Sequence, residues 1–382
     1  MSDWETSTLG EIGEGLAGLT YSPSQVTESG GTLVLRSSNI QNGTLALDDT
    51  VFVNAQVSDK IRVQPSDILL CVRNGSRRLI GKSLYLDERV EGQTFGAFMT
   101  VFRSPMNDYL RYFFQSDEFK RQVDEHLGAT INQITNRSLK SFVVTHPGFR
   151  EQKEISDRLN DLDDLVELST KLLSKKRAIK QGMMQELLTG RTRLPGFEGE
   201  WEETTLGAIS RIKTGSRNNQ DKVKNGTYPF FVRSATIERI DTYSYDKEAI
   251  LVPGEGGIGS IFHYVSGKFE VHQRVYMISD FLSDVVGRFV YYYLREFFGT
   301  HAMEHSVKAT VDSLRLPTFK SFKLRLPPTR VEQDAIAEVL CDADAEIAAL
   351  ERRLETTRAI KQGMMQELLS GRTRLPLGED VV

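Results

Sequence analysis

Apolar side chains recur at alternating spacings of four and three residues along two long stretches of this chain. Such a 3.5-residue period is typical of helices that pair as a coiled coil, and about 40 residues of helix would make a rod of roughly 60 Å. The first series is Ile155, Leu159, Leu162, Val166, Ser169, Leu173, Lys176, Lys180, Met183 and Leu187. The second series is Ile336, Leu340, Ala343, Ile347, Leu350, Leu354, Thr357, Lys361, Met364 and Leu368. Both series turn polar midway, which favours a single register.

Local signals mark where these two helices begin and end. Thr329 and Glu332 have the spacing of a capping box that would begin the second helix after Pro327-Pro328. Gly190 and Gly371 are expected to end the two helices, since a proline follows each of them within five residues.

The ends of the two helical series are copies of each other. Residues 177–195 read RAIKQGMMQELLTGRTRLP, and residues 358–376 match them at eighteen of nineteen positions. Trp4 and Trp201 open a second matched pair, WETSTLGEI and WEETTLGAI. The long repeat is offset by 181 residues and the tryptophans by 197, so the length difference lies before the helices. Two copies therefore share one role, while the segments before them have different roles.

The boundaries that follow are a variable domain at 1–150, a fixed helix at 151–195, a second variable domain at 196–328, and a second helix with a tail at 329–382. The variable domains look mixed α/β, and the whole chain is expected to be α+β with a pseudo-twofold internal duplication. The predicted strands are Thr32–Arg36, Asp67–Arg73, Ser138–Val144, Ala249–Val252, Ser260–Val265 and Thr318–Leu324. The predicted helices of these domains are Met106–Val123 and Asp284–Phe297.

Composition limits the class of protein without defining it. The 382 residues are 39% hydrophobic and 26% charged, which suits two domains with cores of their own. The sequence shows no long apolar run and no basic, apolar leader, so we expect no membrane segment. Cys71 and Cys341 lie in different halves, which favours a reducing cytoplasm. With a net charge of −4, binding to nucleic acid would need basic side chains sorted onto one face, or partner subunits.

Three short motifs could carry chemistry. Gly254–Gly259 matches GxGxxG but precedes the strand-like SIFHYV, so a glycine-rich turn is expected rather than a nucleotide site. His301–His305 matches HxxEH, but nothing marks a third ligand, so we expect a connecting stretch that is solvated or faces DNA, and no metal. Glu118–Lys120 resembles a nuclease ExK but falls on the solvated face of an amphipathic helix. We therefore expect a binding protein with no catalytic residues and no cofactor. An enzyme that uses HxxEH or GxGxxG is an alternative.

The paired WE..TLG.I segments, the Glu-Gln pairs at 151–152 and 332–333, and the paired RAIKQGMMQELL ends resemble the specificity subunits of type I restriction–modification systems over essentially the whole chain. This resemblance implies two target-recognition domains, each reading one half of a split site in double-stranded DNA. It also implies that the two helices form an antiparallel spacer and dock two copies of an adenine-N6 methyltransferase subunit. An ATP-dependent restriction and translocation subunit would then join. A coiled-coil scaffold that does not bind DNA is the main alternative.

The candidate interaction residues follow from side-chain chemistry. Arginine and asparagine suit guanine and adenine, and other polar groups suit phosphates. The candidates for DNA contact are Arg73, Asn74, Ser76, Arg77, Arg78, Arg233, Lys268, His272, Gln273 and Arg274. Adaptable methionines beside the mid-helix glycines Gly182 and Gly363 suggest a partner contact or a close approach of the sister helix. The candidates for partner contact are Met183, Met184, Leu187, Met364, Met365 and Leu368.

Overall fold

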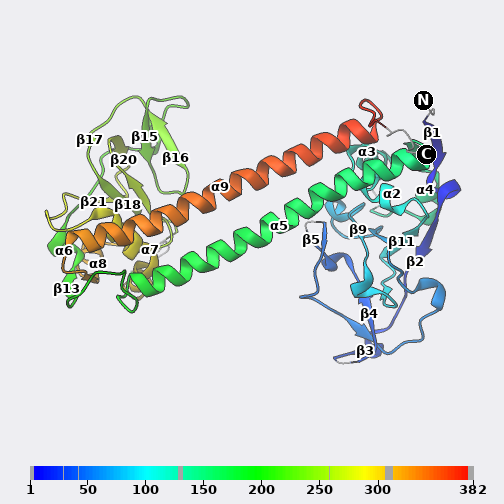
Figure 1. The fold of residues 1–382 in the computed structure, drawn as a ribbon, viewed down its shortest axis with the longest axis horizontal. Helices are drawn as coiled ribbons and strands as arrows, with labels where there is room; N and C mark the ends of the chain where they lie inside the picture. The colour runs from blue at the N-terminus through cyan, green and yellow to red at the C-terminus, as the bar shows by residue number, and fades with distance from the viewer. Residues whose placement is uncertain are drawn as a thin grey trace. The chain divides into compact units, whose positions relative to one another are not determined.

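The computed structural model describes residues 4–28, 30–41, 43–127, 132–257, 259–305 and 313–376 (Figure 1). The chain divides into two compact units. The first unit is Met1–Leu168 with Arg353–Val382, and the second unit is Ser169–Arg352. Each unit therefore combines one variable segment with parts of both long helices.

The first unit is built on two four-stranded sheets in the described part of the chain. One sheet is antiparallel in the order β2 (Glu14–Ala17), β11 (Met99–Arg103), β8 (Ile68–Cys71), β9 (Ser83–Tyr85). The other has the order β10 (Thr94–Phe95), β4 (Thr32–Leu35), β7 (Phe52–Val53), β3 (Val26–Thr27), with β10 and β4 parallel. Shorter ladders pair β1 (Glu5–Thr8) with β12 (Val143–His146), and β5 (Ile40–Gln41) with β6 (Thr44–Leu45). The helices of the variable segment are α1 (Leu9–Ile12), α2 (Asn107–Phe113), α3 (Asp117–His126) and α4 (Asn136–Ser141).

The second unit repeats this plan. Its antiparallel sheet has the order β14 (Arg211–Thr214), β21 (Val275–Ser279), β18 (Ala249–Pro253), β19 (His263–Val265). Its other sheet has the order β16 (Ile237–Ile240), β15 (Tyr228–Phe231), β20 (Lys268–Val271), β17 (Tyr245–Asp246), with β15 and β20 parallel. The ladder of β13 (Glu202–Thr205) and β22 (Lys323–Leu326) corresponds to that of β1 and β12. The helices of this variable segment are α6 (Leu206–Ile209), α7 (Gly287–Glu304) and α8 (Leu316–Lys320).

The central strands β8 and β18 are buried on both faces, which explains their unbroken apolar sequences. Ile68 and Leu70 join the core that includes α2 and α3. Leu69 and Cys71 join a second core, to which strands of both four-stranded sheets contribute side chains. Because side chains alternate along a strand, one short segment ties two cores together. Strand β18 does the same in the second unit.

The long helices α5 (Phe149–Leu187) and α9 (Arg330–Leu369) confirm the predicted period. Every position of both predicted series is buried or half-buried. In the second unit Lys176 binds Glu346 at 2.7 Å and Lys180 binds Asp344, so the partner number falls as the α5 number rises. In the first unit Glu151 binds Arg374 and Asp163 binds Lys361, so the partner number again falls as the α5 number rises. The two helices are therefore antiparallel within each unit (Figure 1).

The repeated helix ends close on the repeated tryptophans. Gly190 has φ +71° and lies so near the Trp201 ring that a Cβ would come within 3.2 Å of it. Gly371 has φ +70° and stands in the same relation to Trp4. Glycine is needed at both positions because the backbone is left-handed and a flat ring covers it. This contact explains why the WE segments and the helix ends are duplicated together.

Several predicted elements differ from the structure. The predicted helix Met106–Val123 is two helices, because the Ser116 hydroxyl accepts the Phe119 N–H at 3.2 Å and starts α3 anew. The predicted strands Ser138–Val144 and Thr318–Leu324 each begin as a short helix, α4 or α8, before a strand. Thr135 caps α4 through a 3.1 Å bond from the Ser138 N–H. Thr329 accepts the Glu332 N–H at 3.3 Å as predicted, but the Glu332 carboxylate binds Arg193 instead of closing the capping box.

Among the helices of the described residues, none has the length and apolar character needed to cross a lipid bilayer.

Candidate nucleic-acid interface

Three loops of the second unit meet at one carboxylate. Arg233 follows β15, Glu255 follows β18, and Arg274 lies between β20 and β21. The Glu255 Oε2 atom accepts a hydrogen bond from Arg233 Nη1 at 3.0 Å, and its Oε1 atom accepts one from Arg274 Nη1 at 2.9 Å. The Glu255 side chain is 20% exposed, while those of Arg233 and Arg274 are 49% and 60% exposed. The carboxylate thus sits inside and presents two guanidinium groups to the surface.

His272 and Gln273 make hydrogen bonds that hold the chain beside Arg274. The buried His272 accepts the Arg274 backbone N–H at its Nδ1 atom at 2.9 Å. Burial, helped by the charges of Arg233 and Arg274, lowers the pKa of His272 below 6.5, so the ring is neutral at pH 7. The exposed Gln273 amide donates to Asn218 Oδ1 at 2.5 Å.

These loops surround a pocket of about 370 Å³. Its lining residues are Asn219, Val232, Arg233, Ser234, Glu238, Glu255, Gly256 and His272. The structure therefore brings Arg233, His272, Gln273 and Arg274 together. Lys268 lies at the opposite end of β20, with its ammonium 4.7 Å from the centre of the Tyr243 ring. It is separate from the cluster.

In the first unit side-chain contacts of Arg73 and Asn74 hold the loop that follows β8. The Arg73 guanidinium lies 5.1 Å from the centre of the Phe98 ring. Asn74 Oδ1 accepts the Ser76 N–H at 2.9 Å, and its Nδ2 donates to Ser37 Oγ at 3.2 Å. These two hydrogen bonds fix the position of the Asn74 side chain within the turn. The neighbouring Arg73 side chain is exposed at the surface.

Arg77 and Arg78 belong to a different place in the first unit. Arg77 Nη2 donates to the Asp124 carbonyl of α3 at 3.1 Å. Both arginines line a cavity of about 570 Å³ whose wall also includes Lys82 and Lys120. The five DNA-contact candidates between residues 73 and 78 thus lie at two separate places on the first unit.

Glu255 and Phe98 were absent from the sequence-based candidates. Phe98 is 57% exposed, and Glu255 is the shared acceptor of two arginines. An aromatic residue in a loop and an acidic residue between glycines carry little signal by themselves. Their contacts with arginines of other loops, which only the structure shows, set Phe98 and Glu255 apart from other surface residues.

The other motifs have structural roles in the described residues. Gly256, Gly257 and Gly259 have positive φ, so GxGxxG forms a turn as predicted. His301 lies in α7 rather than in a connecting stretch, since the helix continues to Glu304, and its Nε2 lies 2.9 Å from the Thr318 carbonyl. Among the described residues no cluster of three or more metal-ligating side chains is found. The ExK candidate lies on α3, where Glu118 binds Arg121 at 2.6 Å.

The structure places the predicted partner-contact residues in or against the chain's own cores, and their contact with a partner stays a prediction. Met184 and Leu187 belong to the core of the second unit, and Met365 and Leu368 to that of the first. Met183 and Met364 pack against the same cores. All six are apolar and lie on the side of their helix that faces the chain's own domains. The predicted close approach of the sister helix at Gly182 and Gly363 is wrong, because a Cβ at either position would meet nothing within 4 Å.

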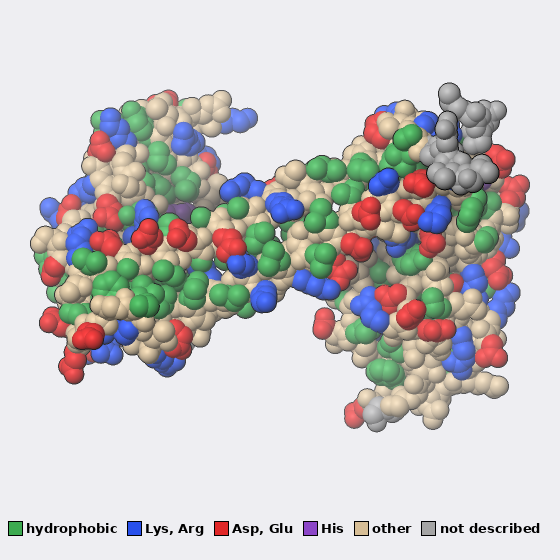
Figure 2. Space-filling view, in the orientation of Figure 1, with side chains coloured by type: hydrophobic (Ala, Val, Ile, Leu, Met, Phe, Trp, Pro, Cys, Tyr) green, Lys and Arg blue, Asp and Glu red, His purple; other side chains and the backbone are tan. Residues whose placement is uncertain are grey.

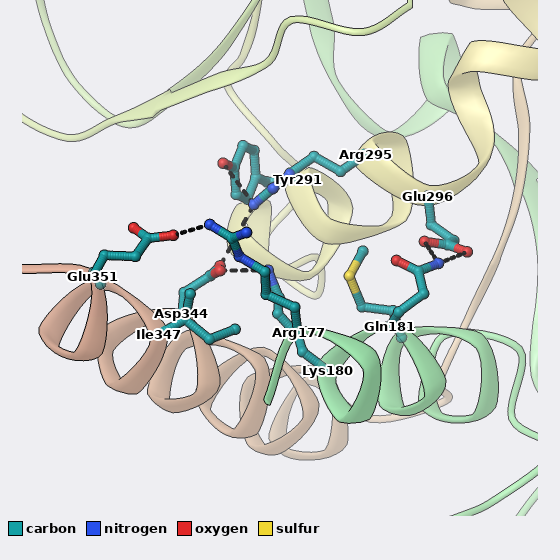
Figure 3. Close-up of a pocket in the computed structure, with 11 residues that line it drawn as sticks. Arg177, Lys180, Gln181, Tyr291, Arg295, Glu296, Asp344, Ile347 and Glu351 are labelled. Carbon is teal, nitrogen blue, oxygen red and sulfur yellow. Dashed lines mark hydrogen bonds and ion pairs between the residues drawn. The ribbon is translucent and has the colours of Figure 1, made fainter. Parts of the chain in front are cut away.

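A polar network beside the long helices occurs in both units. In the second unit Asp344 binds Lys180, accepts the Tyr292 hydroxyl at 2.9 Å and lies 3.5 Å from Arg295. Figure 3 shows Lys180, Asp344 and Arg295 of this network at the wall of a cavity of about 590 Å³. At the same cavity Gln181 of α5 donates to Glu296 of α7 at 2.8 Å. Burial is the main cause of a strongly raised pKa at Tyr292, so the hydroxyl remains a donor.

The first unit contains the same network at matching positions. Asp163 accepts hydrogen bonds from Lys361 at 2.5 Å and from the Tyr112 hydroxyl at 3.0 Å. Lys361 and Asp163 are each 181 residues from Lys180 and Asp344, with the order of the helices exchanged. The two units are therefore two versions of one framework that carries diverged loops.

The two units share their sheets, their long helices and the Lys–Asp–Tyr network, but their loops differ. The fold therefore defines a protein built from two diverged copies of one domain. A model of the type I restriction modification DNA specificity domain matches residues 1–175 and 198–357. The chain belongs to this family, that of the specificity subunits of type I restriction–modification systems.

Individual relatives carry the same description. The chain is 27% identical over 225 residues to the type I restriction enzyme StySPI specificity subunit of Salmonella potsdam, covering 54% of this chain and 48% of that protein. It is 29% identical over 171 residues to the EcoDI specificity subunit of Escherichia coli, covering 45% and 37%. It thus matches about half or less of the length of these two relatives. A putative MjaX specificity subunit of Methanocaldococcus jannaschii is 25% identical over 420 residues, covering 98% and 94%.

Solved structures show the fold. The crystal structure of a type I restriction–modification S subunit from M. genitalium has a TM-score of 0.67 and covers 96% of both chains at 16% identity. A structure from work on the assembly and conformational transition of the type I R-M system has a TM-score of 0.55, covering 96% of this chain and 97% of that one at 16% identity.

Proposed function

We propose that this chain reads a bipartite site in double-stranded DNA, each unit recognising one half. The observation that carries this proposal is the duplication of the Lys–Asp–Tyr network around Asp163 and Asp344 beneath loops that differ in sequence. A frame preserved twice with different surfaces suits one task performed on two targets. The two long helices, antiparallel in each unit, act as the spacer between target-recognition domains.

The electrostatics suit selective rather than indiscriminate binding. The net charge is −4, and Figure 2 shows basic and acidic side chains intermixed over the visible face. Non-specific binding depends on many phosphate contacts and would need a broad basic surface. A few exposed arginines held by neighbours, such as Arg73, Arg233 and Arg274, are better suited to reading base edges.

The outward face of each repeat offers a docking site for a partner. Ile179 and Ile360 are 46% and 50% exposed at equivalent positions. Ile179, Gly182 and Gln185 follow one another at intervals of three residues, and Ala178 lies four residues before Gly182. They therefore share one exposed helical face, which the second repeat reproduces. Core packing explains why buried repeat residues are identical, but it does not explain identity on this exposed face. Two identical partner subunits do explain it.

The partner that fits the family is an adenine-N6 methyltransferase subunit, bound in two copies, with an ATP-dependent restriction and translocation subunit joining the complex. The chain itself supplies recognition and no catalysis. Its arginine-lined loops are organised for hydrogen bonding, and Glu255, the acidic group among them, is engaged by two arginines.

Co-expression with the methyltransferase subunit, followed by mapping of methylated adenines in host DNA, tests this function. We expect a split motif, modified once on each strand, with a spacer of fixed length. A stable complex that neither modifies DNA nor binds duplexes selectively would contradict the proposal and favour the alternative of a coiled-coil scaffold without DNA binding.

A further inference from the structure

Backbone hydrogen bonds define a reference frame around the basic loop of the first unit. The Val72 N–H donates to the Phe98 carbonyl at 3.1 Å, and the Val72 carbonyl accepts the Ile134 N–H at 2.8 Å. The next residue, Arg73, forms an isolated antiparallel bridge with Gln133.

The same frame occurs in the second unit. The Gly254 N–H donates to the Arg274 carbonyl at 2.9 Å, and the Gly254 carbonyl accepts the Leu314 N–H at 2.8 Å. The next residue, Glu255, forms an isolated antiparallel bridge with Ser313. Arg73 therefore corresponds to Glu255, and Phe98 corresponds to Arg274, although a simple offset between the repeats does not reveal it.

The two positions touch each other in both units, but their chemistry differs. In the first unit a cation, Arg73, lies 5.1 Å from the centre of the Phe98 ring. In the second unit a carboxylate, Glu255, binds the Arg274 guanidinium at 2.9 Å. A conserved backbone frame thus carries a cation–π contact in one unit and an ion pair in the other.

Each arrangement leaves hydrogen-bond donors at the surface. A guanidinium stacked on a ring keeps its in-plane N–H groups available, and these match the O6 and N7 atoms of guanine. Phe98, 57% exposed, can also contact a thymine methyl group. In the second unit Glu255 positions Arg233 and Arg274 by accepting one N–H from each, and the other N–H groups of each guanidinium can donate to an acceptor on DNA.

The net charge of the two arrangements is the same. Arg73 with Phe98 carries one positive charge, and so do Arg233, Glu255 and Arg274 together, because His272 beneath them is neutral. Attraction to phosphates is then similar in the two units, while the pattern of donors and apolar contacts differs. A difference of this kind changes which base is preferred rather than how tightly DNA is held.

The geometry points to Arg73–Phe98 and Glu255–Arg274 as equivalent specificity-determining pairs, each reading one or two base pairs of its own half-site. This inference rests on the proposed function. Arg73, Phe98 and Arg274 contact bases, and Glu255 is a positioning residue that acts through Arg233 and Arg274.

The test measures binding by the chain assembled with its methyltransferase subunit. The probes are duplexes in which each base pair of the mapped site is substituted in turn. For Arg73→Ala we expect discrimination to fall by about 5- to 150-fold at one or two neighbouring positions of one half-site, with the other half unchanged. Arg274→Ala should do the same in the other half-site. Glu255→Gln should weaken discrimination at the positions that Arg274 reads.

Matched controls separate base reading from general effects. Arg121→Ala on α3 and Lys323→Ala on β22 remove exposed, ion-paired cations of the same two units, and both should leave the discrimination profile unchanged. The double variant Arg73→Glu with Phe98→Arg installs the second unit's pair in the first unit. It should alter the preferred base in one half-site only.

Uniform weakening over all base pairs would identify phosphate contacts and overturn the inference, as would an unchanged profile. Thermal unfolding of each variant is measured alongside, and Arg73→Lys supplies a second substitution that keeps the charge but loses the planar donors. If the unsubstituted complex binds no split site, the proposed function itself fails. If it binds a split site and these variants keep its profile, only the present inference fails.

Discussion

Arg374 and Glu151 form a two-point ion pair that joins the second repeat to the first turn of α5. The Nε–Oε1 and Nη2–Oε2 distances are both 2.6 Å. Arg193 and Glu332 make the same pair in the second unit at 2.5 and 2.7 Å. In each unit the glutamate is almost completely buried and its arginine is partly exposed. Each repeat therefore supplies the cation that neutralises a buried carboxylate.

Arg374→Ala should destabilise the first unit, because Glu151 would remain buried without its partner. Loss of one member of a buried pair typically costs about 3–5 kcal/mol, and we expect the lower end because Arg374 is 35% exposed. Urea unfolding of the purified chain measures the change. Arg372→Ala, which removes an exposed pair with Glu367, should change stability by less than about 1 kcal/mol. Equal effects of the two variants would contradict the assignment.

Lys361→Ala and Lys180→Ala should loosen different units. Each substitution removes the cation from an aspartate that also accepts a tyrosine hydroxyl, at an expected cost of about 1–2 kcal/mol. Hydrogen exchange followed by mass spectrometry should show faster exchange around Tyr112 in the first variant and around Tyr292 in the second. Exchange that rises equally in both units would show that the chain does not behave as two units.

His272 should make the second unit less stable in mild acid. The folded state lowers the pKa of His272, so the unfolded chain binds the proton more readily. Its stabilising contribution is complete above about pH 6.5 and declines as the pH falls below that value towards the folded-state pKa. The urea midpoint of the unsubstituted chain should therefore fall more between pH 7.5 and 5.5 than that of His272→Gln. His126→Gln, at an exposed position in the first unit, is the control and should keep the full pH dependence.

The two cysteines should differ sharply in reactivity. Burial raises the pKa of the Cys71 thiol to about 11, and its side chain is inaccessible within β8. Cys341 is only half-buried on α9. Because the thiolate is the reacting form, iodoacetamide at pH 8 should label Cys341 and leave Cys71 unmodified until the chain unfolds. Peptide mass spectrometry identifies the labelled residue, and early modification of Cys71 would contradict the packing around β8.

Ile179→Asp and Ile360→Asp should each remove one docking site while the fold is kept, because both side chains are about half exposed. We expect native mass spectrometry with the methyltransferase subunit to show two bound copies for the unsubstituted chain, one for either single variant, and none for the double variant. Leu168→Asp is the matched control, since Leu168 is 64% exposed on α5 outside the repeat. An unchanged stoichiometry in the double variant would show that the partner binds elsewhere.

The sequence predicted the long helices well because a 3.5-residue period reports burial directly. It failed at residues 138–144 and 318–324, where an alternating pattern also fits a short helix followed by a strand. The capping hydroxyl of Thr135 and the burial of Leu139 decide in favour of the helix at the first of these sites. Such local competition depends on contacts with the rest of the domain.

The candidate interface was predictable only in part. Side-chain chemistry identified Arg73, Arg233 and Arg274. It could not identify Phe98 or Glu255, whose significance comes from the residues that they touch across separate loops. The burial of the repeat methionines could not be predicted for a related reason, since an apolar face on a repeated helix looks the same in sequence whether its own domain or a partner covers it.

The tryptophan rings over Gly190 and Gly371 also bear on how such proteins change over generations. Trp4 and Trp201 belong to the variable segments, whereas the glycines that they cover belong to the repeats. A foreign segment that kept this tryptophan, and the tyrosine that binds Asp163 or Asp344, could pack on the same helices without further change. Whole variable segments could then be exchanged between such proteins, while the repeated helix ends that they pack against stay the same.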